Sequence, residues 1–157
     1  MCPVDWGTLA GTALGAVLGV STTLLGERSR WRRENTSRER AAKQQLYSEF
    51  LAALWVTRHR LRDLKRSIDL SREERIKQSG EILAAANAYQ LLYQMHIMAP
   101  EPLGDVADQT FVRLRNLRDR FDEPDVSTDP EWSATQGALG EALEALRRAM
   151  RSDLKAS

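Results

Sequence analysis

The sequence predicts an all-α protein, in which a single N-terminal transmembrane helix continues into a long helix and an antiparallel bundle of about four helices. Three observations predict this class. Residues 6–26 carry no charged side chain. Apolar residues then recur at intervals of three and four along several later segments. Alternation with a period of two is absent over any strand-length segment, so we expect no β-sheet.

The average composition conceals this organisation. The chain has 157 residues, a formal net charge of +1 and 42% hydrophobic residues. These values suit one domain and exclude a multidomain enzyme, a collagen-like chain and a wholly disordered tail. The single cysteine, Cys2, cannot form an intramolecular disulfide, so a disulfide-stapled scaffold is excluded as well.

The uncharged segment 6–26 is long enough to cross a membrane as a helix, since 21 residues rise roughly 30 Å, the thickness of a bilayer's hydrocarbon core. One alternative is a buried helix of a soluble domain. Its five glycines disfavour this, because each costs about 1 kcal/mol against alanine in a soluble helix. A cleaved signal peptide is the other alternative, but residues 1–5 contain Asp5 and no basic side chain.

The charges beside this segment predict its orientation. Four arginines follow it directly: Arg28, Arg30, Arg32 and Arg33. Basic flanks stay in the cytoplasm, so we expect residues 1–5 outside the cell membrane and the rest of the chain inside. Trp6 and Trp31 bracket the span and suit its two interfaces. The same arginines predict contact with the headgroups of anionic membrane lipids.

Glycine recurs every fourth residue within the predicted span, at Gly7, Gly11, Gly15 and Gly19. At this spacing the glycines line one face of a helix and let another backbone approach closely. The pattern favours helix packing in the membrane, either in a homo-oligomer or with another membrane protein. The alternative is a chance product of a composition rich in alanine and glycine.

After the span, residues 27–43 read as a basic helical stalk, and residues 44–157 as a cytoplasmic helical bundle. Neither proline nor glycine occurs from residue 27 to 68, which predicts one unbroken helix. Its second half carries a heptad stripe of Tyr47, Phe50, Leu54, Thr57, Leu61, Leu64 and Ile68. A coiled coil built on this helix alone is the weaker alternative.

Three further helices complete the predicted bundle. Ser71 and Glu74 form a capping-box signature that opens the second, which we expect to run unbroken to Ala99, before Pro100. Its stripe is Ile76, Leu83, Ala86, Tyr89, Leu92 and Tyr93. The third begins near Pro102 and buries Leu103, Val106, Thr110, Leu114, Leu117 and Phe121. The fourth follows the loop 122–131 and buries Trp132, Leu139, Leu143, Leu146, Met150 and Leu154.

No motif predicts catalysis. The histidines, His59 and His96, lack the Glu-x-x-His spacing of a di-iron bundle, and His96 is better explained as a partly buried residue with a hydrogen-bond partner. GxSxG and glycine-rich phosphate loops are absent from the sequence. We therefore expect no catalytic residue, no metal, no cofactor and no small-molecule substrate.

The basic run 58–66 is a candidate for nucleic-acid contact. Residues 67–157, however, hold eleven basic and sixteen acidic side chains, and this net charge of −5 would repel a polyanion. We expect no nucleic-acid partner. The pattern favours a non-enzymatic interaction or scaffold protein anchored in the membrane. A holin-like or toxin-like pore former is the alternative, because the repeated glycines lie in a threonine-rich, moderately polar span.

Overall fold

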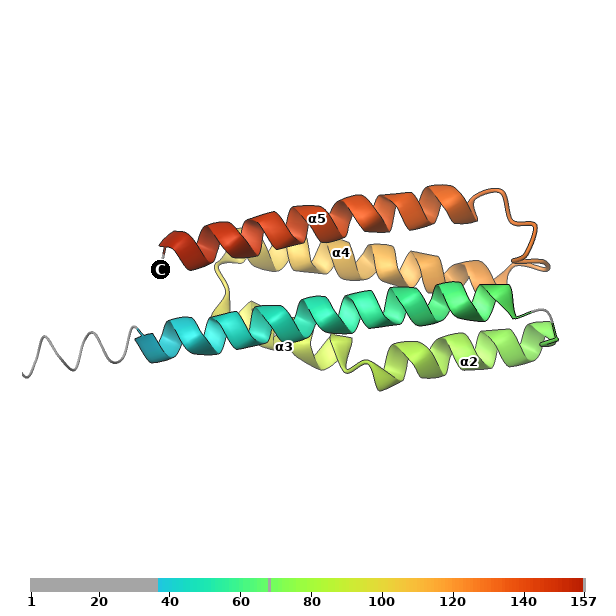
Figure 1. Ribbon diagram of the computed structural model, residues 1–157, viewed down its shortest axis with the longest axis horizontal. Helices are drawn as coiled ribbons and strands as arrows, with labels where there is room; N and C mark the ends of the chain where they lie inside the picture. The colour runs from blue at the N-terminus through green and yellow to red at the C-terminus, as the bar shows by residue number, and fades with distance from the viewer. Residues whose placement is uncertain (1–36, 68, 157) are drawn as a thin grey trace, which may run out of the picture. The chain divides into compact units, whose positions relative to one another are not determined.

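The computed structural model describes residues 37–67 and 69–156 of the chain, and residues 41–157 make up one compact unit. The described residues are helical from 37 to 66 and then form α2 (Arg72–Ala85), α3 (Ala88–Met98), α4 (Glu101–Asp119), the short 3₁₀ helix η1 (Arg120–Asp122) and α5 (Trp132–Ala156) (Figure 1). These residues contain no strand. The predicted all-α bundle is therefore confirmed for this part of the chain.

The first helix of the unit and α5 are antiparallel neighbours. Near one end, Asp153 accepts hydrogen bonds from Lys43 Nζ at 3.1 Å and from Tyr47 Oη at 2.8 Å. At the other end, Lys65 Nζ lies 4.9 Å from the ring centre of Trp132. Burial, followed by the hydrogen bond to Asp153, raises the pKa of the Tyr47 hydroxyl. These contacts fix the pairing of the two helices over their shared length.

The other helices complete the bundle in sequence order. Arg72, at the start of α2, donates to the carbonyl oxygens of Asp122 and, at 3.4 Å, of Glu123, so α2 runs antiparallel to α4. Thr110 Oγ1 lies 3.3 Å from the carbonyl oxygen of Ala142, which joins α4 to α5. The helix 37–66, the pair α2 and α3, then α4 and finally α5 form four successive rods of the bundle. These rods alternate in direction, as short connections require.

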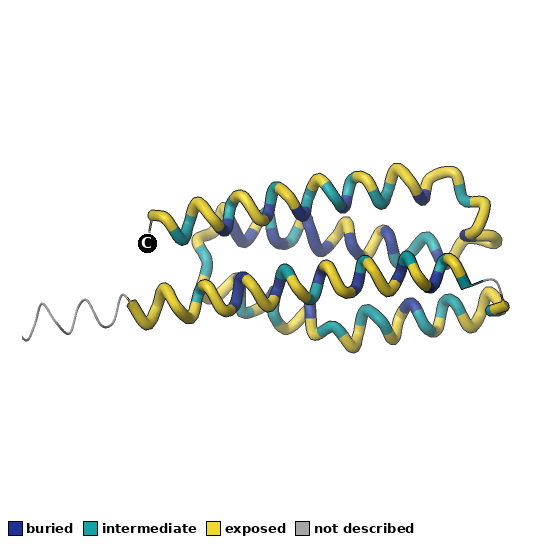
Figure 2. Tube along the Cα trace, viewed as in Figure 1, coloured by how far each residue is buried: buried dark blue, intermediate teal, exposed yellow. Residues whose placement is uncertain are grey.

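The buried residues face the centre of the bundle (Figure 2). Every described member of the predicted heptad is buried, namely Tyr47, Phe50, Leu54, Thr57, Leu61 and Leu64. Ile68 lies outside the described residues. The predicted α4 and α5 stripes are confirmed too, with Val106 and Leu154 only partly buried. Val126, from the 122–131 loop, is an additional core residue that the periodic pattern did not indicate.

The buried serine and threonine hydroxyls of this part of the chain are each bonded to their own helix. Thr57 donates to the carbonyl of Ala53, Thr110 to that of Val106, and Ser79 to that of Ile76, each at 2.7 Å. A buried hydroxyl without a partner would cost about 1–3 kcal/mol. Bonding back to the preceding turn removes that cost without a second side chain.

The described residues all follow the predicted membrane segment in the chain. No helix among residues 37–67 and 69–156 is long and apolar enough to span a bilayer. The span 6–26, the N-terminus 1–5 and most of the stalk 27–43 lie outside the described residues. Residues 37–42 are helical and exposed, and Leu46 is the first buried residue of the described range.

The second predicted helix is broken in two, which corrects the expectation of one helix up to Ala99. Its capping box is present, since Ser71 Oγ accepts from the Glu74 N–H at 3.2 Å and Glu74 accepts from the Ser71 N–H at 2.9 Å. The helix ends at Ala85, and Asn87 adopts φ 50° and ψ 15°, in the left-handed region. Asparagine enters this region more readily than other non-glycine residues.

The break changes which face of the following helix is buried. In α3 the buried residues are Ala88, Leu92 and Met95. Tyr89 and Tyr93, predicted to be core residues, are 72% and 68% exposed, so that prediction was wrong. An unbroken helix would have carried the inner stripe of α2 onto these tyrosines, whereas the turn at Asn87 displaces the stripe by one residue.

We expect the left-handed conformation of Asn87 to govern stability at this point. Asn87→Ala should lower the free energy of unfolding by about 1 kcal/mol. Alanine has a Cβ, which disfavours the left-handed region, but it lacks the short polar side chain that lets asparagine adopt this conformation. Asn87→Gly should leave it nearly unchanged. Urea denaturation followed by circular dichroism measures both. Asn116→Ala, on the exposed face of α4, is the control and should not destabilise. An Asn87→Ala variant as stable as the parent would contradict the prediction.

Candidate functional site

A hollow with a largely apolar lining lies between α2, the start of α3, and α4. It has a volume of about 570 Å³. We call it the α2–α4 groove. Gly80, Leu83 and Ala84 form the α2 wall, and Phe111, Arg115 and Arg118 form the α4 wall. Asn87, Tyr89 and Gln90 line it where α2 gives way to α3.

The groove exists because α2 presents small side chains where a tighter bundle would need large ones. A Cβ built on Gly80 meets no atom within 4 Å, so the space beside it is open. Ala84 stands one turn further along the same wall. Of the 14 residues of α2, all of them described, Ser79 is the buried one. The helix is therefore held mainly at its start, by the hydrogen bonds of Arg72 and by Arg75, which donates to the Ser67 carbonyl at 3.3 Å.

An exposed apolar ridge begins at the end of this groove. The Tyr89 ring meets the Phe111 ring edge-on, with centroids 5.6 Å apart and an interplanar angle of 71°. Tyr93 and Ile97 follow Tyr89 at intervals of four on α3, so the three share one helix face. Their exposures are 72% for Tyr89, 68% for Tyr93 and 72% for Ile97. We call these three residues the α3 ridge.

Two arginines give the groove a positive charge. Arg115 is exposed, and no ion pair joins it to another described residue. Arg118 Nη2 lies 3.0 Å from Asp119 Oδ1, while its Nε is buried and has no hydrogen-bond partner among the described residues. Both arginines follow Phe111 on the same face of α4. The groove thus combines an apolar floor with cationic groups on one wall.

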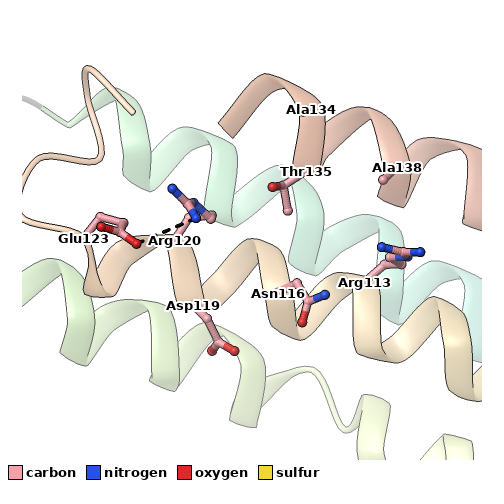
Figure 3. Close-up of a pocket in the computed structure, with 8 residues that line it drawn as sticks. All are labelled: Arg113, Asn116, Asp119, Arg120, Glu123, Ala134, Thr135 and Ala138. Carbon is pink, nitrogen blue, oxygen red and sulfur yellow. Dashed lines mark ion pairs between the residues drawn. The ribbon is translucent and has the colours of Figure 1, made fainter. Parts of the chain in front are cut away.

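A second cavity, of about 490 Å³, lies between α4 and α5 and is lined mainly by polar residues, among them Arg113, Asn116 and Thr135 (Figure 3). Arg120, at its edge, is fully engaged with acids. Its Nε and Nη2 donate to the two Asp129 oxygens at 2.7 Å each, and its Nη1 donates to Glu131 at 2.9 Å. This network holds the 122–131 loop against the bundle, so we assign it a structural role.

The carboxylate of Asp129 is the buried centre of that network, with its side chain 2% exposed. The hydrogen bond from Arg120 holds the pKa of Asp129 below its usual value. The paired hydrogen bonds are charge-assisted and bidentate, the strongest geometry available to an arginine and a carboxylate. In the same loop, hydrogen bonds from Ser127 and Thr128 lower the pKa of Asp125.

The histidines lie apart from the groove walls. His96, expected to be partly buried, is 44% exposed, and its Nε2 lies 3.1 Å from Asp108 Oδ1. Its position is corrected, although it does have a partner. The helix break explains this, because it places Met95 rather than its neighbour in the core. His59 stacks on Trp55 at 5.8 Å and contacts Arg62. Among the described residues no three potential ligands gather around a metal position.

Comparison with protein-family models, with curated proteins and with solved structures finds no match for this chain. The candidate site is therefore defined by its own geometry.

The site residues expected from the sequence all lie outside the described residues. They are Gly7, Gly11, Gly15 and Gly19 of the packing face, Arg28, Arg30, Arg32 and Arg33 of the basic flank, and the interface residues Trp6 and Trp31. The groove and the α3 ridge were missed. The four-residue spacing of Tyr89, Tyr93 and Ile97 was visible, but it indicated a core stripe. Only the asparagine at position 87 could have signalled the break.

We expect Asp129 to make stability sensitive to acid. Its folded pKa is depressed, so its contribution is present above the unfolded value of about 4 and is lost as the pH falls through the folded value. The parent should therefore lose stability more steeply below about pH 4 than Asp129→Asn, in urea denaturation from pH 7 to pH 2. Asp69→Asn, in an exposed turn, is the control and should keep the parent's slope. Equal slopes for parent and Asp129→Asn would contradict the assignment.

Proposed function

We propose that this protein is a non-enzymatic, single-pass membrane-anchored interaction or scaffold protein, whose cytoplasmic bundle presents the α3 ridge to a partner. The observation that carries the proposal is the exposure of Tyr89, Tyr93 and Ile97 on one face of α3. Tyrosine is enriched in the cores of protein interfaces, where its ring buries a large area and its hydroxyl keeps a polar contact. Large apolar side chains that share one exposed helix face are typical of an interaction site.

Apart from the edge-on contact between Tyr89 and Phe111, folding of the bundle does not use the ridge. The inward face of α3 is already supplied by Ala88, Leu92 and Met95. Exposed tyrosines and isoleucine on the opposite side add little to the stability of the isolated chain. Their burial would gain roughly 1.5–3 kcal/mol for each large apolar side chain that a partner covers fully. This difference supports association as the role of the face.

The membrane part of the proposal rests on the sequence. The uncharged span 6–26, its basic C-terminal flank and the four-residue glycine repeat favour an anchor that pairs with another transmembrane helix. The pairing helix belongs to a second copy or to another membrane protein. In this arrangement the anchor raises the local concentration of the bundle at the membrane, and the α3 ridge selects the partner.

We expect a reporter fused after Ser157 to be active only as a cytoplasmic fusion, because the basic flank keeps the C-terminal side in the cytoplasm. The fusion should sediment with membranes and resist extraction by high salt. Deleting residues 1–26 should release a soluble helical protein with a cooperative thermal melt. An exported reporter would refute the orientation. An aggregated deletion product would indicate that residues 1–26 belong to the core.

Substitution in the glycine repeat separates the two functional classes. Gly11→Leu with Gly15→Leu should weaken crosslinking between transmembrane helices in intact membranes and leave growth unaffected. Rapid loss of membrane potential on expression of the parent, abolished by the same pair, would instead establish the holin-like or toxin-like alternative.

We expect a photocrosslinking residue at position 93 of the full-length protein in membranes to give a discrete adduct. The same residue at position 56 is the matched control, because Val56 is 49% exposed on the first helix. The adduct should disappear in Tyr89→Glu with Ile97→Glu, which places charges on the ridge. Ile97→Glu should alter the unfolding free energy by about 0.5 kcal/mol or less. Tyr89→Glu also removes the edge-on contact with Phe111 and should cost about 0.5–1.5 kcal/mol. Equal adducts from positions 93 and 56 would refute the ridge as an interface.

A further inference from the structure

We propose that the α2–α4 groove is the specificity pocket of this interface and that its occupant is an acidic amphipathic helix of a partner protein. The inference rests on the proposed interaction function and names the chemistry of its partner. One apolar side chain of that helix enters the open space beside Gly80, and a carboxylate within a turn of it contacts Arg115 and Arg118.

The apolar half of the pocket is built from the walls of two helices. Leu83 and Phe111 supply hydrophobic surface, and the space beside Gly80 is unoccupied by any atom within 4 Å of an added Cβ. The volume of about 570 Å³ falls within the range of roughly 300–1,000 Å³ that is typical of ligand sites. A leucine or phenylalanine side chain entering this space would complete the packing that α2 leaves unfinished.

The charged half of the pocket selects an acidic partner. Arg115 is exposed and has no ion-pair partner among the described residues, whereas Arg118 Nη2 lies 3.0 Å from Asp119 Oδ1. A carboxylate placed against this wall would form a charge-assisted pair with Arg115. Because Arg115 and Arg118 follow Phe111 by four and seven residues, a helix lying along the groove meets apolar surface first and positive charge one to two turns later.

The groove and the α3 ridge form one continuous surface. Tyr89 lines the groove and is also the first residue of the ridge, with its ring against Phe111. A partner helix anchored in the groove therefore extends over Tyr93 and Ile97. Such a helix reads as apolar residues at positions i, i+3, i+4 and i+7, the pattern of helix-in-groove recognition.

The same charges disfavour a second copy of this chain as the occupant. In a two-fold interface centred on the groove, Arg115 and Arg118 would face the same arginines of the other copy. Like charges brought together in this way repel each other. A nucleic acid would stack on Tyr89 and Tyr93, but it would leave the apolar space beside Gly80 unfilled. An acidic amphipathic helix satisfies both halves of the pocket.

The test uses full-length protein in nanodiscs of neutral phosphatidylcholine and a fluorescein-labelled peptide of three heptads. The peptide carries leucine at i, i+3, i+4 and i+7, with glutamate at i+8, one turn beyond the leucine at i+4. We expect saturable binding by fluorescence anisotropy. Arg115→Glu with Arg118→Glu should weaken it at least tenfold, and a peptide with lysine in place of glutamate should regain affinity for that variant.

Gly80→Leu is the sharper variant, because a Cβ at this position meets no atom within 4 Å and the rest of the side chain would occupy the groove. It should weaken peptide binding about tenfold or more. Gly137→Leu is the matched control: a Cβ there also meets nothing within 4 Å, on an exposed position of α5. It should bind as the parent does. Both substitutions replace a helical glycine, so both should melt at or above the parent's temperature.

Each of the following outcomes would overturn the proposal. The first is equal binding by Gly80→Leu and Gly137→Leu, or no saturable binding by the parent. The second is a labelled oligothymidine that binds more tightly than the peptide. The third is a change in oligomeric state caused by Gly80→Leu alone. A position-93 adduct that persists in Gly80→Leu would refute the groove as the binding pocket and leave the interaction function standing. Absence of the adduct when Gly80 is unchanged would refute the interaction function itself.

Discussion

The left-handed backbone at Asn87 is the constraint on which the arrangement of the bundle's second rod depends. Successive residues of an α-helix lie about 100° apart around its axis. Displacing the buried stripe by one residue therefore rotates the buried face by more than a quarter of a full rotation. The displacement brings Ala88 and Met95 into the core and moves Tyr89 and Tyr93 to the surface. The small side chain of Ala88 and the flexible side chain of Met95 thus pack in the core, where two tyrosine rings would otherwise have to fit. The surface chemistry of α3 follows from one backbone conformation.

The helix before the break, α2, is the least firmly packed α-helix of the described unit. It contributes Ser79 to the buried set, whereas α4 contributes seven residues and α5 five. Its attachment depends on its first turn, through the capping box of Ser71 and the hydrogen bonds of Arg72 to the end of α4. Elements with few buried contacts open locally at low free energy, and binding surfaces are commonly drawn from them. The groove and the weak packing of α2 have one origin, the small residues Gly80 and Ala84.

Periodicity predicted the parts of the fold in which burial follows from helix geometry alone. The stripes of the first helix, α4 and α5, and the capping box at Ser71, are local patterns with direct physical causes. The break was not predictable in this way, since residues 84–88 consist of four alanines and Asn87, and alanine favours helix. Core packing outweighed that preference. Val126 is buried from a loop, and Arg120 finds Asp129 across the same loop, so neither has a periodic signature. The groove was not predictable from the sequence because it arises where Gly80 and Ala84 have no large side chain to fill the space.

The shared carboxylate of Asp153 has a mechanical consequence. It joins the last turns of α5 to Lys43 and Tyr47, so the compact unit begins and ends at the same end of the bundle. Tension applied between the two ends of the unit would load these bonds first. It would then separate the first helix from α5 one turn after another. Helices pulled along their length would instead resist as a whole. The unit is therefore built to yield progressively under a pull between its termini, with Asp153 as the first point of failure.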